Sequence, residues 1–242
     1  MPIAPFVRRR RYPVIEDEDE AVVTYAADFE KDTANEYLSI VDNPSLSIEG
    51  DMSIVFWVNF ESLATEIIVS KMGNAGQYGY DFYIDGVNVL FRVSNDGTAL
   101  STTAKAVAGI STGTWYYFSA YHDDGTEIGV GYNNGAFGVV PHVTGIFDSN
   151  APFHLGRGFA SLPVDGLLAY VGIWSKKLSA GENTTLVAAG PNLQYSGLSA
   201  LLKTNLVSWW DLEEASGARV DSHGSNDLTD NNTVGRAEVV YP

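Results

Sequence analysis

Short apolar segments separated by Asp-Gly and Asn-Gly pairs recur through much of the chain, and this feature most constrains the fold. Residues 80–84 and 87–93 alternate in character on either side of Asp85-Gly86, a sequence typical of a β-hairpin with a type I′ turn. Further turns are indicated at Asn95-Asp96-Gly97, Asp124-Gly125 and Asn134-Gly135. Short strands at this spacing predict an all-β fold, a two-sheet antiparallel jelly-roll sandwich.

One or two short helices are expected near the end of this region. Ser179 is followed three residues later by Glu182, which is the spacing of a capping box. The helix should continue over residues 183–189 and end at Gly190-Pro191, and a second short helix is predicted over residues 198–203.

The charge and cysteine content exclude several classes of function. The chain has 14 Lys and Arg against 30 Asp and Glu, a formal net charge of −16, which disfavours binding to nucleic acid. No segment approaches the roughly 18 consecutive apolar residues of a membrane-spanning helix. The absence of cysteine removes disulfides, thiolate metal sites and cysteine nucleophiles.

The first twenty residues differ from the rest and predict an extended N-terminal arm, residues 1–20. A basic block is followed by an acidic one, and three prolines disfavour helix or central strand. One interpretation is a solvated tail. The other is an arm that orders against a partner through basic and aromatic side chains, namely Phe6, Arg8, Arg9, Arg10, Arg11 and Tyr12.

The order of segments between about residues 24 and 190 resembles the laminin-G-like, concanavalin A-type lectin and glucanase jelly-roll superfamily, in particular its prokaryotic and viral branch. The matching segments are residues 27–30, 36–40, 44–47, 53–58, 68–71, 113–116, 152–156 and 165–174. The resemblance implies the jelly-roll fold, which serves lectins, adhesion modules, glycan hydrolases and structural proteins alike. One departure is that Ala169 and Tyr170 stand where relatives often have an acidic pair.

Residues 206–242 resemble the opening of such a domain but come last in this chain. In a circular permutation these strands would return to complete their own sandwich, which is the interpretation we favour. Alternatively they complete the sheet of a neighbouring copy. The predicted organisation is an arm over residues 1–20 and a jelly roll over 21–242, in which 191–205 form a linker with a short helix.

Candidate sites are few, and no catalytic residue is assigned. Two carboxylates held across a groove would be needed for glycan hydrolysis, and no such pair stands out. Exposed aromatic rings could stack on a sugar or simply pack in the core, the candidates being Tyr78, Tyr80, Tyr83 and Trp115. Structural calcium could bind Asp221, Asn226 and Asp227, although polar loops often turn on such residues without a metal. His122, His142, His154 and His223 show no metal-ligand spacing.

We therefore expect a non-enzymatic structural protein of a virion, a bacteriophage capsid decoration or cement protein anchored by its arm. The expected partners are the major capsid protein or other virion subunits, and further copies of the chain, for example in a trimer. The N-terminus lacks the order of a secretory signal, so we expect synthesis in a host cytoplasm. A capsid exterior tolerates a negatively charged body, so we expect the jelly roll to lie on the capsid surface. The alternative is a carbohydrate-binding, lectin-like adhesin module with a glycan partner. A filament subunit built by strand exchange is a third hypothesis.

Overall fold

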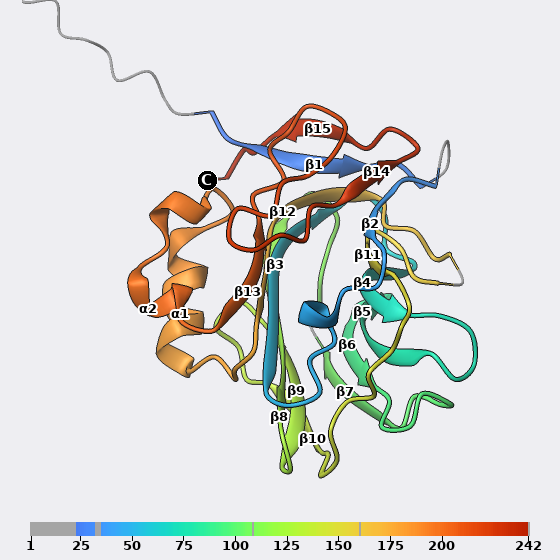
Figure 1. The fold of residues 1–242 in the computed structure, drawn as a ribbon. Helices are drawn as coiled ribbons and strands as arrows, with labels where there is room; N and C mark the ends of the chain where they lie inside the picture. The colour runs from blue at the N-terminus through green and yellow to red at the C-terminus, as the bar shows by residue number, and fades with distance from the viewer. Residues whose placement is uncertain (1–22, 32–34, 108, 160, 242) are drawn as a thin grey trace, which may run out of the picture.

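The computed structural model describes residues 23–31, 35–107, 109–159 and 161–241, and within them two antiparallel sheets form a sandwich (Figure 1). The eight-stranded sheet runs β10 (Gly138–Pro141), β9 (Glu127–Tyr132), β8 (Trp115–Asp123), β3 (Met52–Phe60), β12 (Gly166–Trp174), β1 (Tyr25–Phe29) and β15 (Gly235–Glu238), with β13 (Leu206–Trp210) also paired to β12. The seven-stranded sheet runs β14 (Thr229–Asn231), β2 (Tyr37–Ile40), β11 (Phe153–Leu155), β4 (Thr65–Met72), β5 (Tyr78–Asp85), β6 (Asn88–Val93) and β7 (Thr102–Val107). The predicted all-β sandwich is confirmed.

The main core lies between the two sheets and is rich in aromatic rings. Phe56 of β3 packs edge-on against Phe82 of β5, with ring centroids 4.7 Å apart, and against Phe118 of β8 at 5.7 Å. All three rings are fully buried. Because side chains alternate along a strand, Tyr80, Phe82 and Ile84 of β5 point into this core and the residues between them point outward.

The hairpin of β5 and β6 forms as predicted, but its turn differs. Asp85 pairs with Asn88 as the last rung of the ladder, so the two turn residues are Gly86 and Val87. Gly86 has a φ of +58° and Val87 is not among the residues with positive φ. The pattern is that of a type II′ turn, which needs glycine only at its first position, so the type I′ turn on Asp85-Gly86 was wrong.

A second apolar layer covers the outer face of the eight-stranded sheet. Helices α1 (Ala180–Ala189) and α2 (Ala200–Lys203) lie against this sheet in Figure 1, and the 3-10 turn η2 (Tyr195–Gly197) lies between them in sequence; another 3-10 turn, η1 (Pro44–Leu46), follows β2. The predicted capping box of Ser179 and Glu182 is present, and Gly190 follows the last turn of α1. Beneath the helices lies a buried cluster that includes Trp57, Tyr117, Tyr170, Trp174, Leu186, Leu202 and Trp209. The helical layer therefore covers this part of the sheet's outer face.

The C-terminal strands pair with strands of the same chain. β13 pairs with β12, β14 with β2 and β15 with β1, so the last strands lie beside the first ones in Figure 1. Trp209 and Trp210 are fully buried. Arg219, which is also fully buried, donates hydrogen bonds to the carbonyl oxygens of Gly217 at 2.5 Å and Val234 at 2.8 Å. The segment thus completes both sheets at one edge of the sandwich.

The predicted arm, with Phe6, Arg8 to Arg11 and Tyr12, lies outside the described residues. Among the helices that are described, none has the length and apolar character needed to cross a lipid bilayer.

Candidate binding site

A row of polar side chains crosses the outer face of the seven-stranded sheet. Register pairs link one residue from each strand in turn, from β14 to β7: Thr229, Ser39, His154, Ser70, Asp81, Arg92 and Thr103. Residues paired in register project from the same face of a sheet. No helix of the described chain packs on this face, in contrast to the other sheet, so the row is the natural place to look for a ligand site.

Two members of the row keep hydrogen-bonding atoms without a partner. Ser70 is 1% exposed and its Oγ is buried and unbonded, and His154 is 7% exposed with an unbonded Nδ1. The two residues lie directly opposite each other on β4 and β11. Buried polar atoms are nearly always hydrogen-bonded in proteins, so two adjacent atoms with no partner among the described residues single out this part of the face.

The next two members of the row form an ion pair that is internally satisfied. Asp81 is fully buried, and its carboxylate accepts a hydrogen bond from Arg92 Nε at 2.8 Å and a second from Arg92 Nη2. The guanidinium also lies 4.0 Å above the ring of Tyr83. Burial raises the pKa of Asp81, and the paired guanidinium opposes this effect. The pair gives the face a rigid polar centre with no net charge.

On the other side of Ser70, a second arginine accompanies His154. The guanidinium carbon of Arg157 lies 3.4 Å from the ring centroid of Tyr37, and the ring of His154 lies 5.6 Å from the same tyrosine. Burial, with a smaller effect from the charge of Arg157, lowers the pKa of His154 to about 4. The imidazole is therefore neutral near pH 7 and has one nitrogen that can donate and one that can accept.

Two cavities flank an exposed aromatic ring on this face. A cavity of about 400 Å³ is lined by His154 and Arg157, and one of about 160 Å³ by Ser70, Asp81 and Arg92. Phe159 lines both and is 48% exposed. The site therefore combines polar groups with an apolar surface, the usual composition of a small-molecule pocket.

The aromatic residues predicted to stack on a glycan are placed unequally by the structure. Tyr80 is 1% exposed, and its hydroxyl donates to the carbonyl of Leu46 at 3.0 Å, so it belongs to the core. Trp115 is also buried, within the layer beneath the helices. Neither ring is exposed for stacking, because Tyr80 points between the sheets and Trp115 is covered on the outer face of the other sheet. Tyr83 faces outward beneath Arg92, and Tyr78 lines the smaller cavity, so these two lie at the candidate site.

The residues predicted to bind calcium form a loop that closes on itself. Asp221 Oδ1 accepts hydrogen bonds from the main-chain N–H groups of Trp209, His223 and Gly224, and its Oδ2 accepts one from Asn226. Asp227 Oδ1 accepts a bond from the main chain of Asp221. A cation would have to displace these bonds. Within the described ranges no three His, Asp or Glu residues are grouped as metal ligands.

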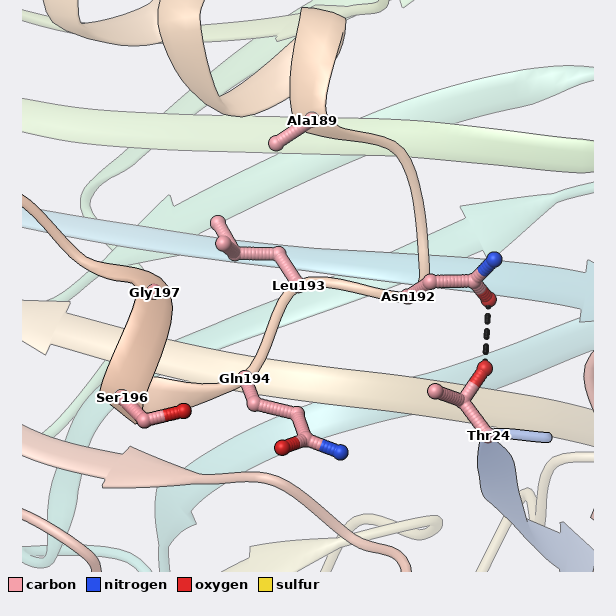
Figure 2. Close-up of a pocket in the computed structure, with 7 residues that line it drawn as sticks. All are labelled: Thr24, Ala189, Asn192, Leu193, Gln194, Ser196 and Gly197. Carbon is pink, nitrogen blue, oxygen red and sulfur yellow. Dashed lines mark hydrogen bonds between the residues drawn. The ribbon is translucent and has the colours of Figure 1, made fainter. Parts of the chain in front are cut away.

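A separate hollow lies between the start of β1 and the segment after α1. Thr24 Oγ1 donates a hydrogen bond of 2.7 Å to Asn192 Oδ1, drawn as the dashed line in Figure 2, and Leu193 and Gln194 also line the hollow. Its lining residues include no ionisable side chain. Because the polar pair in view is already hydrogen-bonded, this hollow is a weaker candidate than the sheet face.

Sequence reasoning identified only Tyr78 and Tyr83 at this face. His154 was classed with isolated histidines, and Arg157 and Phe159 were not singled out. Asp81 and Arg92 carried a usable signal, because each is a charge at the outward position of an otherwise apolar strand. The apposition of Ser70 and His154 depends on a pairing between distant segments and has no local signal.

Comparisons with known proteins agree with the fold. Residues 32–182 match the family profile described as the Concanavalin A-like lectin/glucanases superfamily. No curated protein matches the chain in sequence.

Several solved structures have a similar fold. A "putative carbohydrate binding protein" from Bacteroides ovatus is similar over 91% of this chain and 61% of its own, with 15% identity and a TM-score of 0.69. The chain therefore spans about three fifths of that protein. A SAP-like pentraxin from Limulus polyphemus matches over 90% of this chain and 94% of its own, with 11% identity and a TM-score of 0.56. Domain 4 of the arabinanase AbnA from Geobacillus stearothermophilus, solved with arabinotriose, matches over 68% and 87%, with 17% identity and a TM-score of 0.50.

Proposed function

Because the chain belongs to the concanavalin A-like lectin and glucanase superfamily, we propose that it is a non-enzymatic carbohydrate-binding protein and that the outer face of its seven-stranded sheet receives the sugar. The Bacteroides ovatus protein is described as carbohydrate binding, and the arabinanase domain was solved with an arabinose oligosaccharide. These likenesses support the class of ligand. The place on the molecule is argued from the residues of this chain.

One observation carries the proposal: unpartnered Ser70 Oγ and His154 Nδ1 lie on the same face as the exposed ring of Phe159. A sugar presents hydroxyl groups, which donate and accept hydrogen bonds, and patches of C–H groups, which pack on an aromatic ring. The serine hydroxyl and the neutral imidazole can each donate or accept. Phe159 supplies an apolar surface between the two cavities.

A glycan array followed by calorimetry on each hit tests the proposal. We expect Phe159→Ala to weaken binding by about tenfold or more, since it removes the apolar contact between the cavities. Ser70→Ala should weaken it by about three- to tenfold, the range of one hydrogen bond. Leu201→Ala is the matched control, because Leu201 is exposed on α2, on the helical side of the molecule.

The proposal is wrong if no glycan binds reproducibly, or if a bound glycan is held equally well by the Phe159→Ala and Ser70→Ala variants and by the wild type. The virion assignment rests on sequence features, among them the arm over residues 1–20, the absence of cysteine and the lack of a catalytic constellation, and none of the relatives named above is described as a virion protein. It stays a prediction from the sequence.

A further inference from the structure

Arg157 is a cation with no anionic partner among the residues that the structure describes. Among the arginines in the described ranges, Arg92 and Arg219 have a carboxylate within ion-pair distance, whereas Arg157 and Arg236 do not. Arg236 at least donates to the carbonyl of Glu213, at 3.1 Å. Arg157 has no hydrogen-bond partner in the described part of the chain, and its Nε is buried.

The chain has 30 acidic residues against 14 basic ones. Despite this excess, no described carboxylate lies within ion-pair distance of Arg157. Arg157 is held in place by the ring of Tyr37, at 3.4 Å, which orients the guanidinium without neutralising it. A buried guanidinium N–H with no acceptor is costly unless a ligand supplies one.

The surroundings of Arg157 form a built site. The cavity of about 400 Å³ that it lines also contains His154, which is more than nine-tenths buried and has an unbonded Nδ1, together with the amide side chains of Asn74 and Gln77. Neither a carboxylate nor a second cation is among its lining residues. These groups suit a single anionic group surrounded by hydroxyls. The neighbouring cavity, where Asp81 already neutralises Arg92, suits an uncharged part of the same ligand.

On the basis of the proposed function, we infer that the sugar bound at this face is acidic and that Arg157 pairs with its carboxylate or sulfate group. A guanidinium offers two parallel N–H donors that match the geometry of such an anion, and hydrogen bonds between charged groups are about twice as strong as neutral ones. His154 and the two amides then bind the oxygens next to the anion. In this role Arg157 determines the specificity of the site for acidic over uncharged sugars.

The test compares acidic probes with uncharged counterparts by calorimetry. The carboxylated probes are sialyllactose and trigalacturonate, and their controls are the methyl esters of the same sugars. The sulfated probe is a sulfated chondroitin disaccharide, compared with the unsulfated form. We expect the wild type to prefer at least one acidic probe by about tenfold or more. Comparing the carboxylated with the sulfated probes shows which anion is preferred.

Variants of Arg157 should remove that preference and leave the rest of the site intact. Arg157→Met should weaken binding of the acidic probe by about tenfold or more and change binding of its uncharged counterpart by less than about twofold. Arg157→Lys should recover part of the lost affinity, because lysine keeps the positive charge but lacks the two parallel N–H donors of the guanidinium. Arg236→Met is the matched control, since Arg236 also lies over a tyrosine ring, that of Tyr25 at 3.9 Å, but at the edge of the other sheet.

Two results overturn the inference while the proposed function stands: equal affinity of the wild type for the acidic and uncharged probes, or an equal loss of both in Arg157→Met. The second result would mean that Arg157 only supports Tyr37. If the wild type binds no probe and no other glycan, the proposed function fails, and the inference fails with it.

Discussion

Replacing His154 with glutamine should remove part of the acid sensitivity of the fold. Burial holds the imidazole neutral in the native state, with a pKa of about 4, whereas in the unfolded chain a histidine titrates near 6.5. Between these values the unfolded state binds more protons than the native state, so stability falls as the pH falls from about 6.5 towards 4. For this pair of values the loss between pH 7.5 and pH 5.0 is about 2 kcal/mol.

The assay is urea-induced unfolding of the wild type and His154→Gln at a series of pH values from 7.5 to 5.0. The variant should lose about 2 kcal/mol less than the wild type over this interval, whatever its stability at pH 7.5. Comparing the two proteins cancels the other titrating groups. These include His142, whose pKa is lowered mainly by burial, and the carboxyl groups of Asp28 and Glu66, whose pKa values burial raises and which act in the opposite direction.

Tyr37→Phe provides the control, because it alters the neighbouring ring and keeps the histidine. Its stability should depend on pH as that of the wild type does. If the curves for His154→Gln and the wild type run parallel from pH 7.5 to 5.0, the native state does not hold this imidazole neutral by burial. The description of His154 as a neutral group at the candidate site would then be wrong.

Two further predictions concern the packing of the sandwich. A Cβ at Gly138 would lie 1.8 Å from the carbonyl oxygen of Lys105, where β10 meets β7. Gly138→Ala should therefore lower the free energy of unfolding, measured by urea denaturation, by about 2 kcal/mol or more. Gly50→Ala is the control, because a Cβ there has nothing within 4 Å, and equal effects of the two substitutions would contradict the close approach at Gly138. Lys71, which is 1% exposed, donates to Asp42 at 2.7 Å and to the carbonyls of Ser149 and Ala151 at 2.8 and 3.0 Å. Lys71→Met should therefore lower the free energy of unfolding by about 2–4 kcal/mol, which is measured as a lower thermal midpoint. Lys105→Met is the control, because Lys105 is exposed, and it should leave the midpoint unchanged. A wild-type midpoint for Lys71→Met would refute this role of Lys71.

Local features of the sequence predicted the secondary structure well where one strand or helix contains its own signal. The alternation of residues 80–93 identified β5 and β6, because every second side chain must enter the core. Ser179 and Glu182 identified the start of α1, because both halves of a capping box lie within one turn. The exact turn residues were missed, since Asp85 can serve either as the end of a strand or as part of the turn.

The candidate site was largely missed because its residues meet only through long-range pairing. Ser70 and His154 are 84 positions apart and become neighbours through the register of β4 and β11. β11 is three residues long and buried throughout, so no alternation reveals which way His154 points. The sequence left open whether Tyr80 and Trp115 stack on a ligand or pack, since an aromatic residue in a strand has the same local sequence in either case, and the structure buries both.

The sequence by itself determined that this chain is a two-sheet antiparallel sandwich, because the alternation of side chains and the glycine turns act within a few residues of each other. Only the tertiary structure decided which sheet face is covered by α1 and α2 and which stays open. That choice depends on how segments far apart in the chain pack together. It also leaves Arg157 with no described carboxylate within ion-pair distance. This follows from the register of the strands and the path of the loops, which neither charge nor composition could indicate.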